Sequence, residues 1–576
     1  MYDEIIKGAT VVDGTGAPGY VADVGIRGGR ISAVAAPGQL DEPAERVVDA
    51  DGLVLTPGFV DPHTHYDAQL LWDPDASPSN VHGVTTVIGG NCGFTLAPIR
   101  AGDADYTRRM MAKVEGMPLA ALEQGVEWNW ETFGEYLDRF EGRIAVNAGF
   151  LTGHCALRKY VMGDDAVGKA ATPEQIEAMR RELADALEAG ALGFSFTQSG
   201  SHSDGDGQPV ASRWSTPEEL ATMAEEVGRH PGTTLEGIVA GCLDQFTDDE
   251  IELFAELSAV ANRPLNWNVL TVDAREPERV PRQLSAWDRA QEKGGRVVAL
   301  SMPVQVPMNM SFLNFCGIWL LPHWQDTLSV PVEERMARLR DPEVRLQLLE
   351  WSQSKEAGVF RRLADFGDYR IGDTYAAANE GLKGRIVRDV AAERGQSAFS
   401  TLLDIVLADE LRTILWPIPQ DDDKASWDLR REVWEDPRTM IGGSDAGAHL
   451  DRMCGAPYTT RFLADCLRGR QLVSLESAVR MLTSAPAALF GLKDRGVIRE
   501  GAIADLVLFD PATVGAEEAT LVHDLPGGTA RLLAGSTGVK RVIVGGTTIV
   551  VDDEPTGATP GTVLRSGRDT ETVTAR

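Results

Sequence analysis

This chain of 576 residues lacks several features that mark common protein classes. Its six cysteines show no short, regular spacing, which excludes a disulfide framework. No uninterrupted apolar run approaches the roughly 18 residues that a membrane-spanning helix needs. Residues 1–6 have neither the basic nor the apolar region of a secretory signal peptide. We therefore expect a cytoplasmic protein that does not enter a membrane.

Cationic residues are also scarce. The chain has 55 Lys and Arg against 86 Asp and Glu, which gives a formal net charge of −31 at pH 7. Nucleic acids and anionic membranes bind proteins through clustered cations, so this balance argues against both as partners. The 43% hydrophobic and 24% charged residues are those of an ordinary globular protein with a large core. We expect an enzyme that acts on a small molecule, and the sequence leaves oligomer formation open.

Both ends of the chain read as short strands. Residues 3 to about 50 contain strand-like runs separated by turn residues, and the apolar runs 504–509 and 539–546 repeat this pattern near the other end. Neither end has enough strands for a sheet of its own. We therefore expect one small composite β-sandwich domain, formed by residues 1–55 together with 485–576.

The middle of the chain alternates strand-like and helix-like segments. The run 84–88 is apolar and β-branched, and Thr172 with Pro173 predicts a helix start, with Thr as the N-cap and Pro at the first helical position. Such alternation is typical of parallel βα units, so residues 56–484 predict a (β/α)8 barrel of the TIM type. The stretch from about 305 to 440, rich in Trp, Met and Arg, is where we expect long insertions.

Only nine residues are histidines, and two of them form an HxH pair, His63 and His65. The pair follows an apolar run at 53–55 that reads as a strand. Alternate residues of an extended segment point the same way, so both imidazoles face one side at the end of the strand. This arrangement suits two nitrogen ligands on one metal ion. The alternative is a surface loop that happens to hold two histidines.

Several blocks of the sequence resemble the amidohydrolase superfamily, and within it the D-aminoacylase (N-acyl-D-amino-acid deacylase) branch. The superfamily blocks are 13–16 (DGTG), 57–65 (PGFVDPHTH), 442–445 (GGSD), 496–501 (GVIREG) and 504–507 (ADLV). The blocks that resemble the branch are 90–93 (GNCG), 153–158 (GHCALR), Arg531 and 538–546. Together they cover nearly the whole chain.

The resemblance implies a metal-dependent hydrolase of amide C–N bonds, with zinc as the metal and an N-acyl-D-amino acid as the substrate. A metal on His63 and His65 polarises water, and Asp445 at a late strand end can touch the metal and accept a proton. Cys92 as a thiolate is a ligand suited to zinc. The alternatives are a small buried apolar residue for Cys92 and a helix cap for Asp445.

The sequence departs from this branch at two positions. The D-aminoacylases have two further histidines on successive later strand ends, whereas the corresponding strands here carry Glu236 and Asn268. Carboxylate and amide oxygens make a poorer zinc site than two imidazoles. Three interpretations follow: one zinc on the four residues named above, which we favour; two metals with Glu236 as a substitute ligand; or a weakened site with altered chemistry.

Five residues are candidates for substrate binding. His154 and Arg158 lie in the GHCALR block, where Arg158 can pair with a substrate carboxylate or, alternatively, form a salt bridge on the barrel rim. His202 lies in a loop rich in Gly and Asp, which is equally typical of a solvated loop. Asn268 offers a carbonyl oxygen. His449, four residues after Asp445, steers a leaving group or merely packs.

Two other functions are compatible with the same sequence. The first is an amidohydrolase that acts on a cyclic amide or another C–N substrate, because members of one fold change substrate through their loops. The second is a metal-poor, non-catalytic binding protein of the same fold, for which the two absent histidines are the only support.

Overall fold

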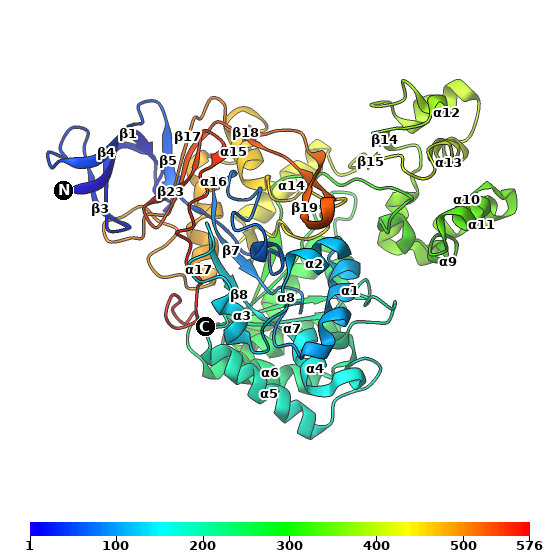
Figure 1. Ribbon diagram of the computed structural model, residues 1–576, viewed down its shortest axis with the longest axis horizontal. Coiled ribbons are helices and arrows are strands. Elements are labelled where there is room, and N and C mark those ends of the chain that lie inside the picture. Colours follow the sequence, from blue (N-terminus) through cyan, green and yellow to red (C-terminus); the bar gives the residue numbers. More distant parts are fainter. The chain divides into compact units, whose positions relative to one another are not determined.

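The computed structural model describes residues 1–576 (Figure 1). The chain forms two units, Met1–Val304 with Lys424–Arg576, and Gln305–Asp423. Parallel strands lie at the centre of the first unit. They are β6 (Phe59–Asp61), β7 (Val84–Gly89), β8 (Asn147–Phe150), β9 (Thr152–Gly153), β10 (Gly193–Gln198), β11 (Thr234–Val239), β12 (Pro264–Trp267), β13 (Arg296–Ser301) and β16 (Thr439–Ile441).

The order of these strands is that of a (β/α)8 barrel. One sheet contains β6, β7 and β8, the other runs from β9 through β13 to β16, and every pair is parallel. Only Leu151 separates β8 from β9, so these two short strands together occupy one position of the barrel. The nine strands of the two sheets therefore fill eight positions. A parallel bridge between Thr64 and Ala446 joins the segments after β6 and β16. The ring therefore closes between its first and last strands.

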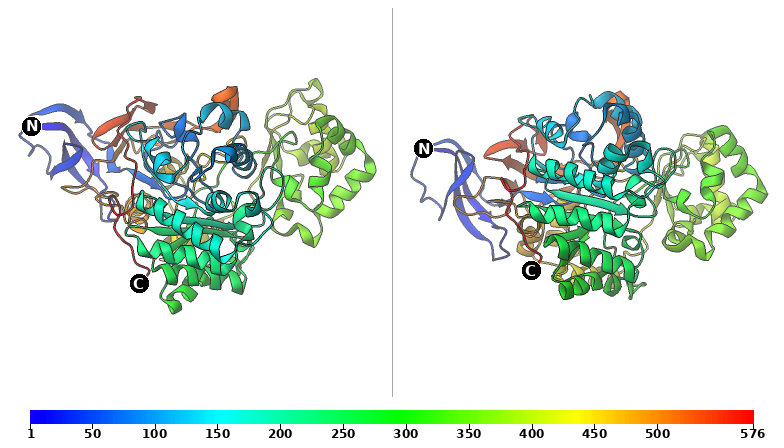
Figure 2. Two further views of the ribbon diagram at one scale, coloured as in Figure 1. Left: turned by 60° about the horizontal axis from the view of Figure 1, so that its bottom comes forward. Right: turned by 90° about the horizontal axis from the view of Figure 1, so that it is seen from below.

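Helices follow the strands along the chain. They are α1 (Ala104–Val114), α2 (Leu119–Gly125), α3 (Phe133–Asp138), α4 (His154–Met162), α5 (Pro173–Glu188), α6 (Pro217–Arg229), α7 (Asp248–Ala261), α8 (Arg279–Lys293), α14 (Lys424–Glu435), α15 (Tyr458–Arg468), α16 (Leu475–Leu482) and α17 (Ser484–Leu489). Figure 2 shows α4 to α8, in cyan and green, side by side along the outside of the strands. No helix of the chain is both long and apolar enough to cross a bilayer.

The start of α5 confirms the helix boundary that the sequence predicts. The Thr172 side chain accepts a hydrogen bond from Gln175 N (3.3 Å), and the Gln175 side chain accepts one from Thr172 N (2.9 Å). This capping box satisfies two amides that the helix itself leaves without partners. Pro173 takes the first helical position, where its missing N–H costs nothing.

A second sheet joins strands from both ends of the chain. Its order is β24-β23-β22-β17-β5-β1-β2-β3, with β4 beside β1. Five strands come from the N-terminal part: β1 (Tyr2–Val11), β2 (Tyr20–Arg27), β3 (Arg30–Ala35), β4 (Ala44–Asp49) and β5 (Val54–Pro57). Four come from the C-terminal part: β17 (Leu506–Phe509), β22 (Val539–Val544), β23 (Thr547–Val551) and β24 (Glu554–Pro555). The two ends share a core because β5 pairs with both β1 and β17.

Smaller two-stranded sheets complete the C-terminal part. They are β18 (Gly515–Ala516) with β21 (Ser536–Thr537), and β19 (Thr520–Leu525) with β20 (Thr529–Leu533). The last residues leave the β-domain and follow the barrel: Gly561 N donates to Ile144 O and Leu564 N to Ala148 O, both at 2.8 Å. Buried Asp505 ties sheet and barrel together, since its carboxylate accepts from Arg495, from Asn147 Nδ2 (3.0 Å) and from Gly545 N (2.7 Å).

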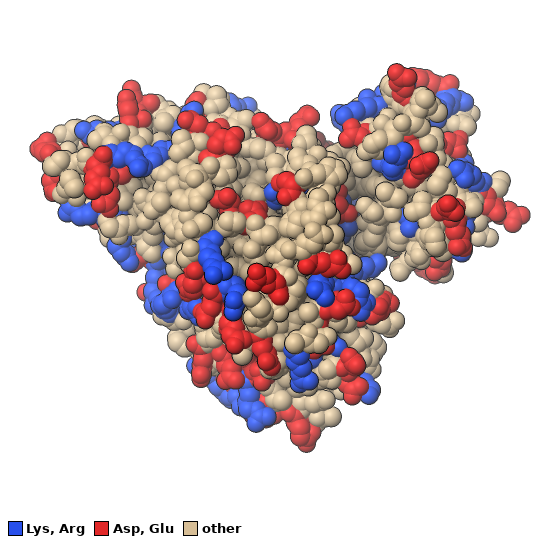
Figure 3. All heavy atoms as spheres, in the orientation of Figure 1, with Lys and Arg blue, Asp and Glu red and all other residues tan.

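The second unit, Gln305–Asp423, has a hydrophobic core of its own. It contains α9 (Trp324–Leu328), α10 (Val332–Arg340), α11 (Pro342–Ser352), α12 (Val387–Arg394), α13 (Ala398–Ala408) and the antiparallel pair β14 (Tyr369–Ile371) and β15 (Leu415–Pro417). The rings of Trp324, Phe366 and Phe399 pack against one another there, with centroids 4.6 to 6.1 Å apart. This unit is shorter than the insertion we expect at 305–440, since α14 belongs to the first unit. Acidic and basic side chains are interspersed on the face of the molecule in Figure 3.

Candidate metal and active site

Three buried side chains meet at the carboxyl ends of neighbouring barrel strands. His63 and His65 follow β6 and Cys92 follows β7, and their ligand atoms lie within 4.8 Å of one another. His63 Nε2 is 3.5 Å from Cys92 Sγ and 3.3 Å from Asp445 Oδ1, and His65 Nε2 is 3.8 Å from the same oxygen. Two imidazoles, a thiol and a carboxylate thus point at one another. Loops after the strands of such barrels are where reactive groups gather.

The backbone around the pair is fixed by the closure of the ring. Thr64 donates from both N and Oγ1 to Ile88 O, at 2.9 and 2.8 Å, which holds the pair against β7. His65 N donates to Ala446 O (2.7 Å), and Ser444 Oγ donates to Asp61 Oδ2 (2.5 Å). The first and last strands are therefore held together by both backbone and side-chain hydrogen bonds.

Three residues of the site adopt the left-handed backbone conformation, which few side chains tolerate. Cys92, Asp445 and His449 all have a positive φ, at 55°, 52° and 52°. Such left-handed residues are uncommon outside glycine and cluster at functional sites. Next to them, a Cβ on Gly90 would meet Leu151 O at 2.1 Å, and one on Gly447 would meet His65 O at 2.5 Å. These close approaches explain why glycines flank the two reactive side chains.

The two positions that depart from the D-aminoacylase pattern both lie in the cluster. Glu236, on β11, is fully buried; its Oε2 accepts from Cys92 N (2.7 Å) and its Oε1 lies 3.9 Å from His63 Nδ1. Asn268, after β12, donates from Nδ2 to Asp445 Oδ1 (3.1 Å). A Cβ on Gly443 would approach the Asn268 side-chain oxygen to 2.5 Å, so the GGS turn leaves room for this amide. Asn268 therefore holds the carboxylate of Asp445.

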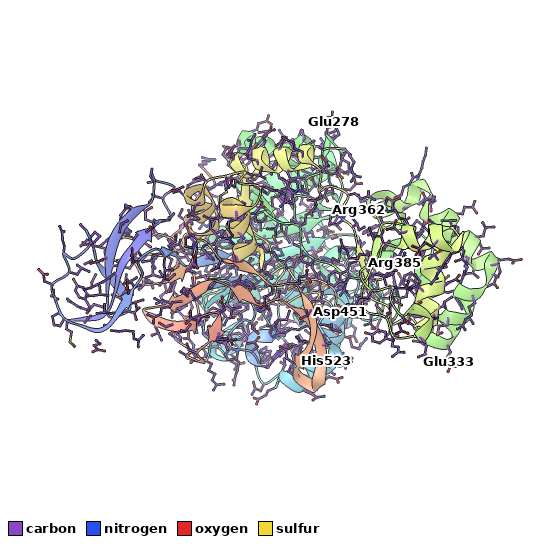
Figure 4. The ribbon with its side chains drawn as sticks, turned by 90° about the horizontal axis from the view of Figure 1, so that it is seen from above. Glu278, Glu333, Arg362, Arg385, Asp451 and His523 are labelled. Carbon is purple, nitrogen blue, oxygen red and sulfur yellow. The ribbon has the colours of Figure 1, made fainter.

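Two residues of the site are not singled out by the sequence. Glu115 follows α1, is only 3% exposed, and places Oε1 3.6 Å from His65 Nδ1. Its own carbonyl accepts a hydrogen bond from His449 N. Arg452 places Nη2 3.1 Å from His449 Nδ1 and pairs with Asp451, which Figure 4 labels near the orange β19 ribbon. Neither belongs to a recognisable motif, because a glutamate after a helix and an arginine in a loop are usually solvated.

Burial and charge set the protonation of the cluster. Burial alone would raise the pKa of Asp445, but the hydrogen bond and charge of His63 outweigh it and lower this pKa to about 2. Asp445 is therefore ionised at neutral pH. Burial lowers the pKa of His65 to about 3 and that of His449 to about 4, so both imidazoles are neutral. Burial raises the pKa of Glu236 to about 7.

The donor set fits a zinc-class ion. Zinc prefers imidazole nitrogen and cysteine sulfur and accepts carboxylate oxygen, usually from four donors. His63, His65, Cys92 and Asp445 supply these types, and both histidines are buried with their Nδ1 atoms lacking a hydrogen-bond partner. Buried polar atoms without partners are rare and require an explanation. Ligation of an ion through the opposite ring nitrogen would account for the burial of both rings.

Comparisons with known proteins identify the family of this chain. The model of the amidohydrolase family matches residues 46–550. This chain belongs to the amidohydrolase family. A D-aminoacylase from Alcaligenes xylosoxydans xylosoxydans is 32% identical over 567 residues, which cover 98% of this chain and 97% of the relative.

Two solved structures extend the comparison. One is a D-aminoacylase studied for the functional role of its binuclear metal centre, with 28% identity, a TM-score of 0.65, and coverage of 98% of this chain and 100% of that one. The other is N-acyl-D-glutamate deacylase from Bordetella bronchiseptica complexed with zinc and a phosphonate inhibitor, with 25% identity, a TM-score of 0.65 and the same coverage. These matches confirm the predicted amidohydrolase membership and the barrel with its β-domain.

The remaining predicted site residues divide into two groups. His202 places Nδ1 2.8 Å from Thr197 Oγ1, and its ring centroid lies 5.3 Å from that of Phe94. Burial lowers the pKa of His202 to about 3, and His449 and Asp445 lie close enough to influence this pKa, so His202 belongs to the surroundings of the cluster. Substrate contact by His202 and His449 stays a prediction.

His154 and Arg158 require a correction. Arg158 is fully buried, and its Nη1 donates to both oxygens of Glu219 at 2.5 and 2.6 Å, while Nη2 donates to Lys169 O at 2.7 Å. His154 Nε2 lies 2.9 Å from Glu219 Oε1 and its Nδ1 lies 3.0 Å from Ser212 Oγ. The expectation that Arg158 binds a substrate carboxylate is wrong, because an internal carboxylate already occupies it. These residues join α4 to α6.

We predict that Arg158→Ala destabilises the fold without weakening substrate binding. Loss of the guanidinium leaves Glu219 as a buried carboxylate without its cation, which costs about 3–5 kcal/mol. Denaturant unfolding measures this loss, with Arg289→Ala as the control, since its ion pair with Glu252 is exposed and screened by water and so contributes little to stability. A KM that rises for N-acyl-amino acids but not for their amides would contradict the structural role.

Proposed function

We propose that this protein is a metal-dependent hydrolase that removes the acyl group from N-acyl-D-amino acids, with one zinc-class ion per chain. The observation that carries the proposal is the buried cluster of His63, His65, Cys92 and Asp445 at the strand ends. Its support is the likeness to a D-aminoacylase along almost the whole chain. A protein that only binds ligands has no evident use for four reactive groups in one buried place.

The same four residues would hold the ion. When bound, a zinc-class ion supplies Lewis acidity that polarises a carbonyl oxygen and makes water more acidic. The chain itself supplies the proton acceptor, because Asp445 is ionised and 25% of its side chain is exposed. Asn268 fixes the orientation of this carboxylate through its hydrogen bond to Oδ1.

Asp445 carries the proton from the water to the leaving group. The water oxygen forms a bond to the acyl carbon of the amide while the carboxylate of Asp445 takes one of its protons. The C–N bond then breaks, and Asp445 returns that proton to the departing amine nitrogen. The products are a carboxylic acid and a free amino acid, and the carboxylate is regenerated.

Arg452 is the side chain that suits the carboxylate of an N-acyl-amino acid. It contacts His449, and its positive charge partly opposes the rise that burial causes in the pKa of Glu115, so this charge reaches the cluster. Arginine binds carboxylates in a bidentate manner, with fixed geometry. A carboxylate held there fixes Cα of the substrate, so the pocket distinguishes D from L by the direction of the side chain.

The proposal is tested by assaying N-acetyl-D- and N-acetyl-L-amino acids side by side, with zinc-loaded and chelator-treated protein. We expect turnover of D substrates alone, lost on chelation and restored by zinc, because the pocket is expected to fix both the carboxylate and the scissile amide. Turnover of a cyclic amide, with no turnover of N-acetyl-amino acids, would show that the protein acts on cyclic amides instead. Inactivity on all of these substrates by protein shown to contain zinc would favour a binding protein.

We predict that Asp445→Asn folds normally but loses turnover. The amide keeps the shape and the contact with Asn268 but cannot accept a proton, and loss of general-base catalysis lowers kcat by about 100- to 10,000-fold. Asp436→Asn is the control, since Asp436 precedes β16 at the opposite end of the strand and pairs with Arg438. Asp445→Asn with more than about a tenth of wild-type kcat would place the proton acceptor elsewhere.

We predict that Arg452→Ala raises KM for N-acetyl-D-amino acids by about 10- to 100-fold, the loss expected for a hydrogen bond to a charged group. The corresponding amino-acid amides lack the carboxylate, so their KM should stay nearly the same. Steady-state kinetics on both substrate series in one variant separates the carboxylate contact from general damage. An equal rise in KM for both series would remove Arg452 from this role.

A further inference from the structure

Each histidine of the pair has one ring nitrogen that faces away from the cluster. The Nε2 atoms face Asp445, and that of His63 also faces Cys92. The Nδ1 atoms of both rings are buried and have no hydrogen-bond partner. A different glutamate lies beside each one: Glu236 Oε1 is 3.9 Å from His63 Nδ1, and Glu115 Oε1 is 3.6 Å from His65 Nδ1.

The chemistry of imidazole gives these glutamates a role. A neutral ring that binds a cation through Nε2 carries its proton on Nδ1. A buried N–H without an acceptor is unfavourable, whereas a carboxylate acceptor fixes both the tautomer and the orientation of the ring. Both gaps are somewhat longer than a direct hydrogen bond, and a small side-chain rotation or one water molecule closes them.

Hydrogen bonds with the neighbouring backbone fix each glutamate in place. Glu236 uses Oε2 to accept from Cys92 N at 2.7 Å, which leaves Oε1 directed at His63 and otherwise without a partner. Glu115 comes from a different part of the fold, the end of α1, where the bond from His449 N to its carbonyl fixes its backbone. Two unrelated segments thus deliver one buried carboxylate each to the outer nitrogens of adjacent histidines.

We propose that Glu115 and Glu236 are positioning residues that accept the Nδ1 protons of His65 and His63, so that both rings present Nε2 to a single shared ion. This inference rests on the proposed function, because it assumes that a metal binds at the pair. It assigns Glu236 to the Nδ1 side of His63, whose Nε2 faces Cys92 Sγ and Asp445 Oδ1. Glu236 is then an acceptor for a ligand, and no second ion is held through it.

The experiment measures metal binding directly and needs no substrate. Wild type and the variants Glu115→Ala, Glu115→Gln, Glu236→Ala and Glu236→Gln are loaded with Zn²⁺ or Co²⁺. Metal content, affinity by chelator competition and the cobalt absorption spectrum are recorded, and circular dichroism checks folding. Glu226→Ala is the matched control, because Glu226 is also a buried glutamate beside a histidine, His230 (3.1 Å), but lies on α6.

We expect one ion per chain in every protein. The two alanine variants should bind it about 10- to 100-fold more weakly, which is the usual effect of removing an outer hydrogen-bond partner of a metal-binding histidine. The glutamine variants should recover most of the affinity, because the amide oxygen still accepts from Nδ1. The thiolate and ligand-field bands of cobalt should keep their positions, since no ligand is lost. Glu226→Ala should match wild type.

Three results would overturn the inference. Wild-type affinity in both alanine variants would show that the histidines need no acceptor. A second ion lost selectively in Glu236→Ala, or shifted cobalt bands in either alanine variant, would make that glutamate a ligand. Wild-type protein that binds no ion would overturn both the inference and the proposed function. The first two results would overturn the inference alone, so the two failures are distinguishable.

Discussion

The closure of the barrel between its first and last strands is the constraint on which the site depends. Asp61 and Ser444 are 383 positions apart in sequence, yet they share a short hydrogen bond, and the parallel bridge between Thr64 and Ala446 lies just beyond it. His63 and Asp445 meet only because these contacts form. A barrel that closed in another register would leave the histidines and their carboxylate on different sides of the ring, since neighbouring strand residues alternate faces.

The site also carries an electrostatic cost that the fold alone does not offset. Burial raises the pKa of Glu115, and the charges of Asp445 and Asp67 raise it further. Burial likewise raises the pKa of Asp67 to about 7. Carboxyl groups buried together favour protonation unless a cation is close, and a bound ion is the largest local charge that such a site can hold. The proposed metal is thus as important for the stability of the charged cluster as for the reaction.

Local patterns in the sequence were enough to predict that the HxH pair faces one side and that a helix starts at Thr172, because spacing along one segment fixes which side chains share a face or cap an end. Placing Asp445 beside the histidines required the family resemblance, since the barrel topology brings distant strands together. Glu115 and the partner of Arg158 were beyond prediction. Whether a glutamate or an arginine is buried depends on which segment packs against it, and single-sequence patterns do not encode that.

Asn268 and Glu236, the two departures from the D-aminoacylase pattern, lie at the two ends of a series of contacts that runs through Asp445 and His63. Asn268 donates to Asp445, whereas Glu236 lies beside His63, and His63 itself contacts Asp445. Where the resemblance implies two imidazoles, this chain has an amide and a carboxylate, which supply one hydrogen-bond donor and one acceptor. In the proposed site, the donor holds the carboxylate that carries the proton and the acceptor orients a histidine, so the same catalytic geometry is supported with one ion. The substitutions therefore read as a change in how the first ion is supported rather than as decay of the site.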